Sequence, residues 1–146
     1  MNRWEHWISL ALWLAGAGHF CILGASMQVP GRLRWKDDLA QLTPFNRKLM
    51  WVYAGTTLLT IIAFGVLTLF LHDDFLRRDR AAMALATFIA IFWTLRIVVD
   101  FTYFKHSDWP VGPQFVAGHV LLTALFTALA ATYWAVLIWG LLPGHS

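Results

Sequence analysis

Five polar residues stand inside long apolar stretches, and their side chains are the ones that could do chemistry. They are His19, Tyr53, Arg96, Asp100 and His119. Histidine can ligate a metal or carry a proton, and arginine can bind an anion through its planar guanidinium. Ionisable groups are costly to place inside a membrane, so each of these residues is a candidate for a functional site.

The two histidines suggest one specific chemistry. His19 and His119 lie on different apolar stretches, and two neutral imidazole nitrogens about 4 Å apart could hold a haem b between them. Gly16 and Gly18 flank His19 and would let a flat macrocycle approach the backbone. The same two histidines could instead bind a quinone or a lipid, transfer a proton, or make ordinary hydrogen bonds between helices.

Arg96 and Asp100 allow two interpretations. Four residues apart on a helix, they are close enough to form a structural ion pair that neutralises the arginine. Alternatively, Arg96 is free to meet an anionic headgroup, a haem propionate or a quinone carbonyl. In a cofactor site, we expect Arg96 and Tyr53 to assist His19 and His119.

Other chemistries lack their residues. The chain has one glutamate, Glu5, so catalysis by paired carboxylates is nearly excluded, and one cysteine, Cys21, so it cannot form an internal disulfide. It has no zinc-protease motif, no nucleophile elbow and no glycine-rich phosphate loop. Its net charge of +3 comes from basic residues that lie beside apolar stretches, where attraction to anionic lipid headgroups explains them. We therefore expect no binding of nucleic acid.

The elements that must position these residues are membrane helices. Only 13% of the 146 residues are charged and 59% are hydrophobic, whereas soluble domains are roughly 25% charged. We predict four transmembrane helices, each with the ~20 residues that cross a bilayer. Together they form a single all-α domain over 1–146, a four-helix transmembrane bundle with helices at about 4–29, 45–71, 78–104 and 114–142.

The segments between these helices carry their own signals. Trp35, Leu39 and Leu42 in "RLRWKDDLAQL" share one face, which predicts a short interfacial helix between the first two spans. Thr43 and Pro44 are typical of a helix start, as N-cap and first residue. The segments "HDDFLRRDR" and "KHSDWPVGPQ" are read as a short charged turn, which makes the second and third spans antiparallel neighbours, and as a chain break.

Counting residues along each helix at 1.5 Å per residue places the polar groups in one half of the membrane. Measured from the side of the first and third connections, Asp100 lies roughly 6 Å deep, His119 7 Å, Tyr53 9 Å, Arg96 12 Å and His19 15 Å. Each helix also carries its polar residues along one stripe. The economical arrangement turns the stripes inward, where they form a polar cavity or network that opens toward one face of the membrane. Three such stripes are Trp93/Arg96/Asp100/Tyr103, Asn46/Tyr53/Thr57/Thr60 and His119/Thr123/Phe126.

Small residues recur every four positions in three of the helices, and such rows let helix backbones approach closely in lipid. The side with the first and third connections carries six Lys and Arg residues and the other side four, which favours both termini outside the cytoplasm. The rows are Ala17/Cys21/Ala25, Ala82/Ala86/Ala90 and Ala124/Ala128/Thr132.

The runs "LTPFNRKLMWVYAGTTLLTIIAFGVLTL", "FWTLR" and "GH" at 118–119 resemble uncharacterised small four-helix membrane proteins of bacteria, a group with no known activity. The resemblance implies a bacterial inner membrane. We expect a subunit or binding module of a membrane complex without catalysis of its own, whose partners are lipids and other membrane subunits or a second copy. The alternative is a redox component that binds haem b or quinone.

Overall fold

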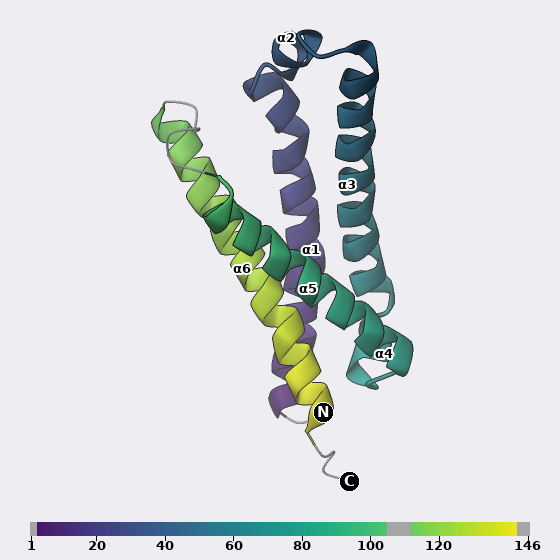
Figure 1. Ribbon diagram of the computed structural model, residues 1–146. Coiled ribbons are helices and arrows are strands. Elements are labelled where there is room, and N and C mark those ends of the chain that lie inside the picture. Colours follow the sequence, from purple (N-terminus) through teal and green to yellow (C-terminus); the bar gives the residue numbers. More distant parts are fainter. Residues whose placement is uncertain (1–2, 105–111, 143–146) are drawn as a thin grey trace.

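The chain is built from helices alone in the part that the computed structural model describes, residues 3–104 and 112–142 (Figure 1). Four of its helices are long and apolar enough to cross a membrane, which confirms the predicted all-α four-helix bundle. These four are α1 (Arg3–Arg32), α3 (Pro44–Phe70), α5 (Arg80–Thr102) and α6 (Pro113–Leu141), and two short helices, α2 (Trp35–Ala40) and α4 (His72–Leu76), join consecutive spans.

Local sequence explains where the helices begin. The Thr43 side chain accepts a hydrogen bond from the Asn46 backbone N–H at 3.5 Å, with Pro44 at the first helical position, as predicted. At the start of α5, Asp79 accepts from the backbone N–H groups of Ala81 and Ala82. These side chains replace the missing partners of the first helical turn. The predicted short helix between the first two spans is α2.

Two predicted span boundaries and one predicted turn need correction. The first span does not end at Val29 but continues through Pro30 to Arg32, because a proline in the last turn removes only one backbone hydrogen bond. The charged turn after α3 contains a turn of helix, α4, and the chain then reverses at Arg78 with a φ of 58°. Because Asp79 is the N-cap, α5 begins at Arg80 rather than 78. Most of the predicted break at 105–114 lies outside the described residues.

The long helices pair as two hairpins. α1 packs along α3, α5 packs along α6, and α1 also contacts α6, which joins the hairpins. In Figure 1 the α5–α6 hairpin lies obliquely across the α1–α3 hairpin. The prediction that the second and third spans are antiparallel neighbours is therefore only partly met, because α3 and α5 meet mainly through the ring of Phe64, which contacts those of Phe88 and Phe92.

Glycines and alanines mark the close contacts. A Cβ on Gly16 would collide with Leu69 of α3, and a Cβ on Gly65 would lie 3.0 Å from the ring of Phe20. The predicted row Ala82/Ala86/Ala90 is buried in α5. The rows of α1 and α6 do not form such contacts, because Ala17, Cys21, Ala124 and Ala128 are exposed.

The bundle is packed in only one of its halves. We call the part that contains both ends of the described chain, α4 and the buried hydrophobic residues the closed half. The open half comprises residues 23–60, 94–104 and 112–125, and Asp100 is the only buried residue among them. In Figure 1 the hairpins diverge toward the end that carries α2. At its closest helix contacts the closed half has Gly16, Gly65 and the alanine row of α5, which let the backbones approach closely, whereas inward positions of the open half include the large side chains of Met50, Tyr53 and Arg96.

Candidate functional site

His19 lies where all four long helices meet. Its imidazole is fully buried, and its ring lies about 6 Å from the rings of Phe64, Trp93 and Tyr133. Nδ1 is 2.7 Å from the Ala15 carbonyl oxygen, which can only accept, so Nδ1 carries the proton. Nε2 then accepts a hydrogen bond of 3.1 Å from the Trp93 indole N–H. Both ring nitrogens are therefore occupied, and the imidazole is neutral.

A second buried contact lies beside His19. The Thr68 hydroxyl donates to the Phe64 carbonyl oxygen at 2.6 Å, so the Tyr133 hydroxyl must donate to Thr68 Oγ1, 2.5 Å away. The closed half thus satisfies its polar side chains internally. Buried polar networks that are fully hydrogen-bonded hold a core in one arrangement, so we assign this cluster to the fold.

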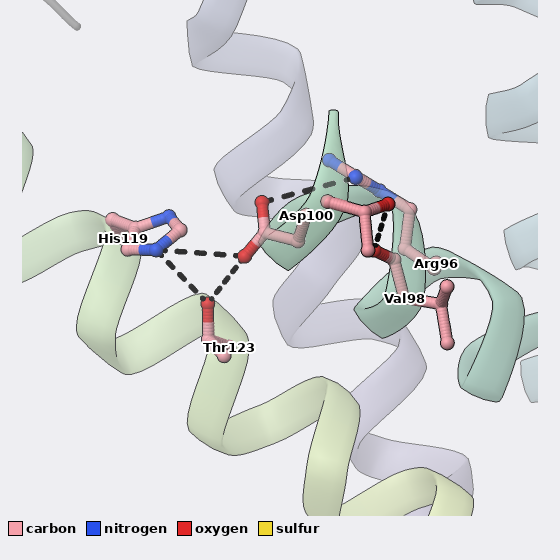
Figure 2. Close-up of polar contacts among 6 residues, drawn as sticks. Arg96, Val98, Asp100, His119 and Thr123 are labelled. Atoms are coloured by element: carbon pink, nitrogen blue, oxygen red, sulfur yellow. Dashed lines mark hydrogen bonds and ion pairs between the residues drawn. The ribbon is translucent and has the colours of Figure 1, made fainter. Parts of the chain in front are cut away.

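Asp100 is the centre of the polar cluster in the open half (Figure 2). Its Oδ2 accepts a hydrogen bond of 2.9 Å from the Thr123 hydroxyl and lies 3.4 Å from His119 Nε2. The other oxygen, Oδ1, faces Arg96 Nη1 at 4.0 Å. Residues from α5 and α6 therefore share one carboxylate, and the ion pair expected from sequence forms, although at a distance too long for a hydrogen bond.

Arg96 is held loosely in this cluster. Its side chain is 40% exposed, and the guanidinium carbon lies 5.4 Å from the ring centre of Phe126 and 5.9 Å from that of Phe104. Such cation–π contacts orient the guanidinium but leave its hydrogen-bond donors unused. Within the described part of the chain, Arg96 makes no hydrogen bond.

Tyr53 is not part of the Asp100 cluster. It lies 11 residues before the buried Phe64, which puts both on one side of α3, yet Tyr53 is 59% exposed. Thr57 shares this side and is also exposed, with its hydroxyl donating to the Tyr53 carbonyl oxygen. The predicted stripe on α3 therefore does turn toward the bundle axis, but the diverging hairpins leave its outer part uncovered.

The two histidines are not placed to share a haem iron. Trp93, which bonds His19, stacks on Phe126 at 5.0 Å, whereas Asp100 lies seven residues after Trp93 and His119 seven residues before Phe126, both toward the open half. Seven residues correspond to about 10 Å of helix, while the two ligand nitrogens would stand about 4 Å apart. The glycines beside His19 serve helix packing instead, with Gly16 against Leu69 and Gly18 against Leu125 and Leu129. Bis-histidine haem does not fit this arrangement.

A third polar contact, which the sequence does not reveal, joins α1 to α4. Ser9 Oγ is 3.0 Å from His72 Nε2, and Asp73 Oδ1 is 3.2 Å from His72 Nδ1, while the imidazole lies against the ring of Trp13. This order of groups matches a hydrolytic triad. However, Ser9 lies within α1, where the helix uses the neighbouring backbone N–H groups, so no oxyanion hole can form at this serine. We regard the contact as structural.

Sequence reasoning missed two of the partners in these clusters. Helical periodicity places Trp93 and Thr123 on inward stripes, but it does not identify them as the donors to His19 and Asp100. Trp93 is 74 residues from His19, and Ser9 is 63 residues from His72, so spacing along the chain carries no signal of either contact.

Comparison with known proteins adds no further constraint, since the chain matches no family model and no similar curated protein or solved structure was found. Function is therefore inferred from the four membrane-length helices and from the geometry of the Asp100 cluster.

Proposed function

We propose that the protein is a membrane-embedded binding module without catalysis of its own, which holds a lipid between its two helical hairpins in the open half. One observation carries the proposal: residues 3–104 and 112–142 leave the inward faces of this half uncovered, although these belong to the same helix faces that form the core of the closed half. Tyr53 and Thr57 are exposed on α3, and Arg96 is half-exposed on α5.

These faces need a covering partner in a bilayer. In a bilayer, polar side chains at this depth are expensive unless they find partners, and packing is the main force that holds helices together. An amphiphile with a polar head and apolar tails supplies both a partner for the polar groups and packing for the apolar ones. The proposal places the chain in a bacterial inner membrane, as the resemblance implies.

The same uncovered faces would accommodate a helix of another membrane subunit or of a second copy, which is the alternative expected from sequence. Arg96 favours the lipid, because its unused donors match a polar headgroup. The redox alternative gains no support from the geometry, since His19 has no free nitrogen and lies about 10 Å of helix length away from His119.

Native mass spectrometry of the full chain in mild detergent tests the proposal. With a mixture of phosphatidylglycerol, phosphatidylethanolamine and phosphatidylcholine added, we expect the wild-type protein to retain one lipid. Thr57→Trp fills the uncovered inner face and should abolish retention. Leu59→Trp, on the exposed outer face of the same helix, is the matched control and should retain the lipid.

Two results would contradict this function. If the protein keeps no lipid, or if both tryptophan variants keep it equally, the open half is not a lipid site. If the purified chain instead carries a second protein chain that Thr57→Trp displaces, the open half is a subunit interface.

A further inference from the structure

The chemistry of the bound headgroup follows from the loose ion pair at Arg96. A guanidinium has five donors in a planar fork that matches two oxygens of one phosphate. Among the residues that the structure describes, the nearest carboxylate oxygen is 4.0 Å away, and the remaining contacts of Arg96 are with the rings of Phe104 and Phe126. The donors of Arg96 are therefore oriented but not engaged.

Asp100, by contrast, is engaged. It is buried, it accepts the Thr123 hydroxyl at 2.9 Å, and His119 Nε2 lies 3.4 Å from the same oxygen, as Figure 2 shows. The carboxylate thus keeps partners on α6 whether or not Arg96 stays beside it. An incoming anion would compete with Asp100 for Arg96 without leaving the carboxylate unpaired.

The position of Arg96 suits a lipid head. Arg96 lies six residues before the end of α5, which is about 9 Å of helix, and an arginine side chain can extend several ångströms toward the interface. Its guanidinium can therefore reach the level of the lipid phosphates, while the apolar residues of the uncovered faces contact the acyl chains. Free phosphate would gain nothing from those apolar faces.

We propose that Arg96 binds the phosphate of a diacyl phospholipid, with Asp100 as the internal carboxylate that this phosphate displaces. The proposal builds on the lipid-binding function above and adds the identity of the headgroup and of the residue that holds it. It implies that Asp100 limits the affinity, because every bound phosphate must draw Arg96 away from it.

The test is a titration of the full chain in detergent with dioleoyl phosphatidylglycerol, followed by native mass spectrometry. Arg96→Gln should weaken binding at least about tenfold, and Arg96→Lys, which loses the planar fork, by a smaller factor. Asp100→Asn removes the competing charge but keeps an acceptor for Thr123, so it should tighten binding several-fold. Arg47→Gln, which removes an arginine near the start of α3, should leave binding unchanged.

Two further probes identify the source of the anion. Dioleoylglycerol has the same tails without the phosphate and should bind at least about tenfold more weakly than phosphatidylglycerol. Millimolar inorganic phosphate should not displace the lipid. Circular dichroism of each variant shows whether the helices are intact, and Asp100→Asn keeps the test decisive if Arg96→Gln fails to fold, since it must increase the affinity.

The outcomes separate the two proposals. If the wild type retains phosphatidylglycerol and dioleoylglycerol equally, or if Arg96→Gln and Arg47→Gln behave alike, lipid binding stands but the phosphate site is wrong. If Asp100→Asn weakens binding, the carboxylate supports Arg96 rather than competing with it, and the phosphate site is again wrong. Displacement by inorganic phosphate would show a site for a free anion. If no lipid is retained at all, both proposals fail.

Discussion

At the scale of single residues, the structure separates two groups that look alike in the sequence. His19 and Asp100 are both buried polar residues in apolar helices. His19 has a partner on each ring nitrogen and belongs to the core, whereas Asp100 lies next to a half-exposed arginine at the edge of the open half. Folding alone explains why His19 is buried, whereas Asp100 is the centre of the candidate site.

The role of His19 predicts the effect of removing its donor. Trp93→Phe keeps an aromatic ring beside Phe126 but leaves His19 Nε2 buried without a partner, so the free energy of unfolding should fall by about 1–3 kcal/mol. Trp134→Phe is the control, because its indole N–H also donates to a side chain, Thr94, but at an exposed position, and it should cost less than about 1 kcal/mol. Unfolding by dodecyl sulfate, followed by circular dichroism, measures both. Equal losses would mean that the bond between Trp93 and His19 does not stabilise the core.

At the scale of elements, the distance between two packed helices depends on the smallest residue at their contact. The α1–α3 hairpin closes over Gly16 and Gly65, and the α5–α6 hairpin over the alanine row of α5. Where bulky side chains occupy the equivalent inward positions, the helices stand farther apart. Close packing in one half and divergence in the other are therefore two results of the same rule.

Two glycines of α3 test this rule. Gly65→Leu must force α1 and α3 apart, because even a Cβ would lie 3.0 Å from Phe20 and 3.2 Å from His19 Cβ, and we expect a loss of at least about 1–3 kcal/mol. Gly55→Leu, three turns earlier, meets no atom within 4 Å. It should be neutral or stabilising by up to about 1 kcal/mol, because leucine favours the helix. The same unfolding measurement applies, and a harmless Gly65→Leu would show that the contact is not close in the membrane.

At the scale of the whole molecule, four spans place the two short helices on opposite sides of the membrane. The side that carries α2 also carries more Lys and Arg, which predicts that α2 faces the cytoplasm and that α4 and both ends of the chain face outward. The open half, with Arg96, then belongs to the cytoplasmic leaflet. This leaflet is the one from which a phospholipid would enter.

Single cysteines test this topology. In a Cys21→Ala background, Asp38→Cys at α2 and Arg77→Cys after α4 lie at exposed positions on the two sides. A maleimide that cannot cross the membrane should label Arg77→Cys from outside intact cells and Asp38→Cys only after lysis. Labelling of both from the same side would contradict four spans, and a reversed pattern would place the open half in the outer leaflet.

The sequence by itself determined the number of spans, their order, the N-cap at Thr43 and the short helix between the first two spans. These features depend on local composition and on helical periodicity, which a single chain displays directly. It also placed Arg96 and Asp100 within reach of each other, because four residues on a helix fix that distance.

Only the tertiary structure decided which polar residues meet and which stay apart. His19 bonds Trp93 and not His119, and Tyr53 lies on an inward face that the described part of the chain leaves uncovered. The physical reason is that crossing angles depend on the bulk of side chains at contacts between helices. Those contacts join residues up to 74 positions apart, and no periodicity within one helix specifies them.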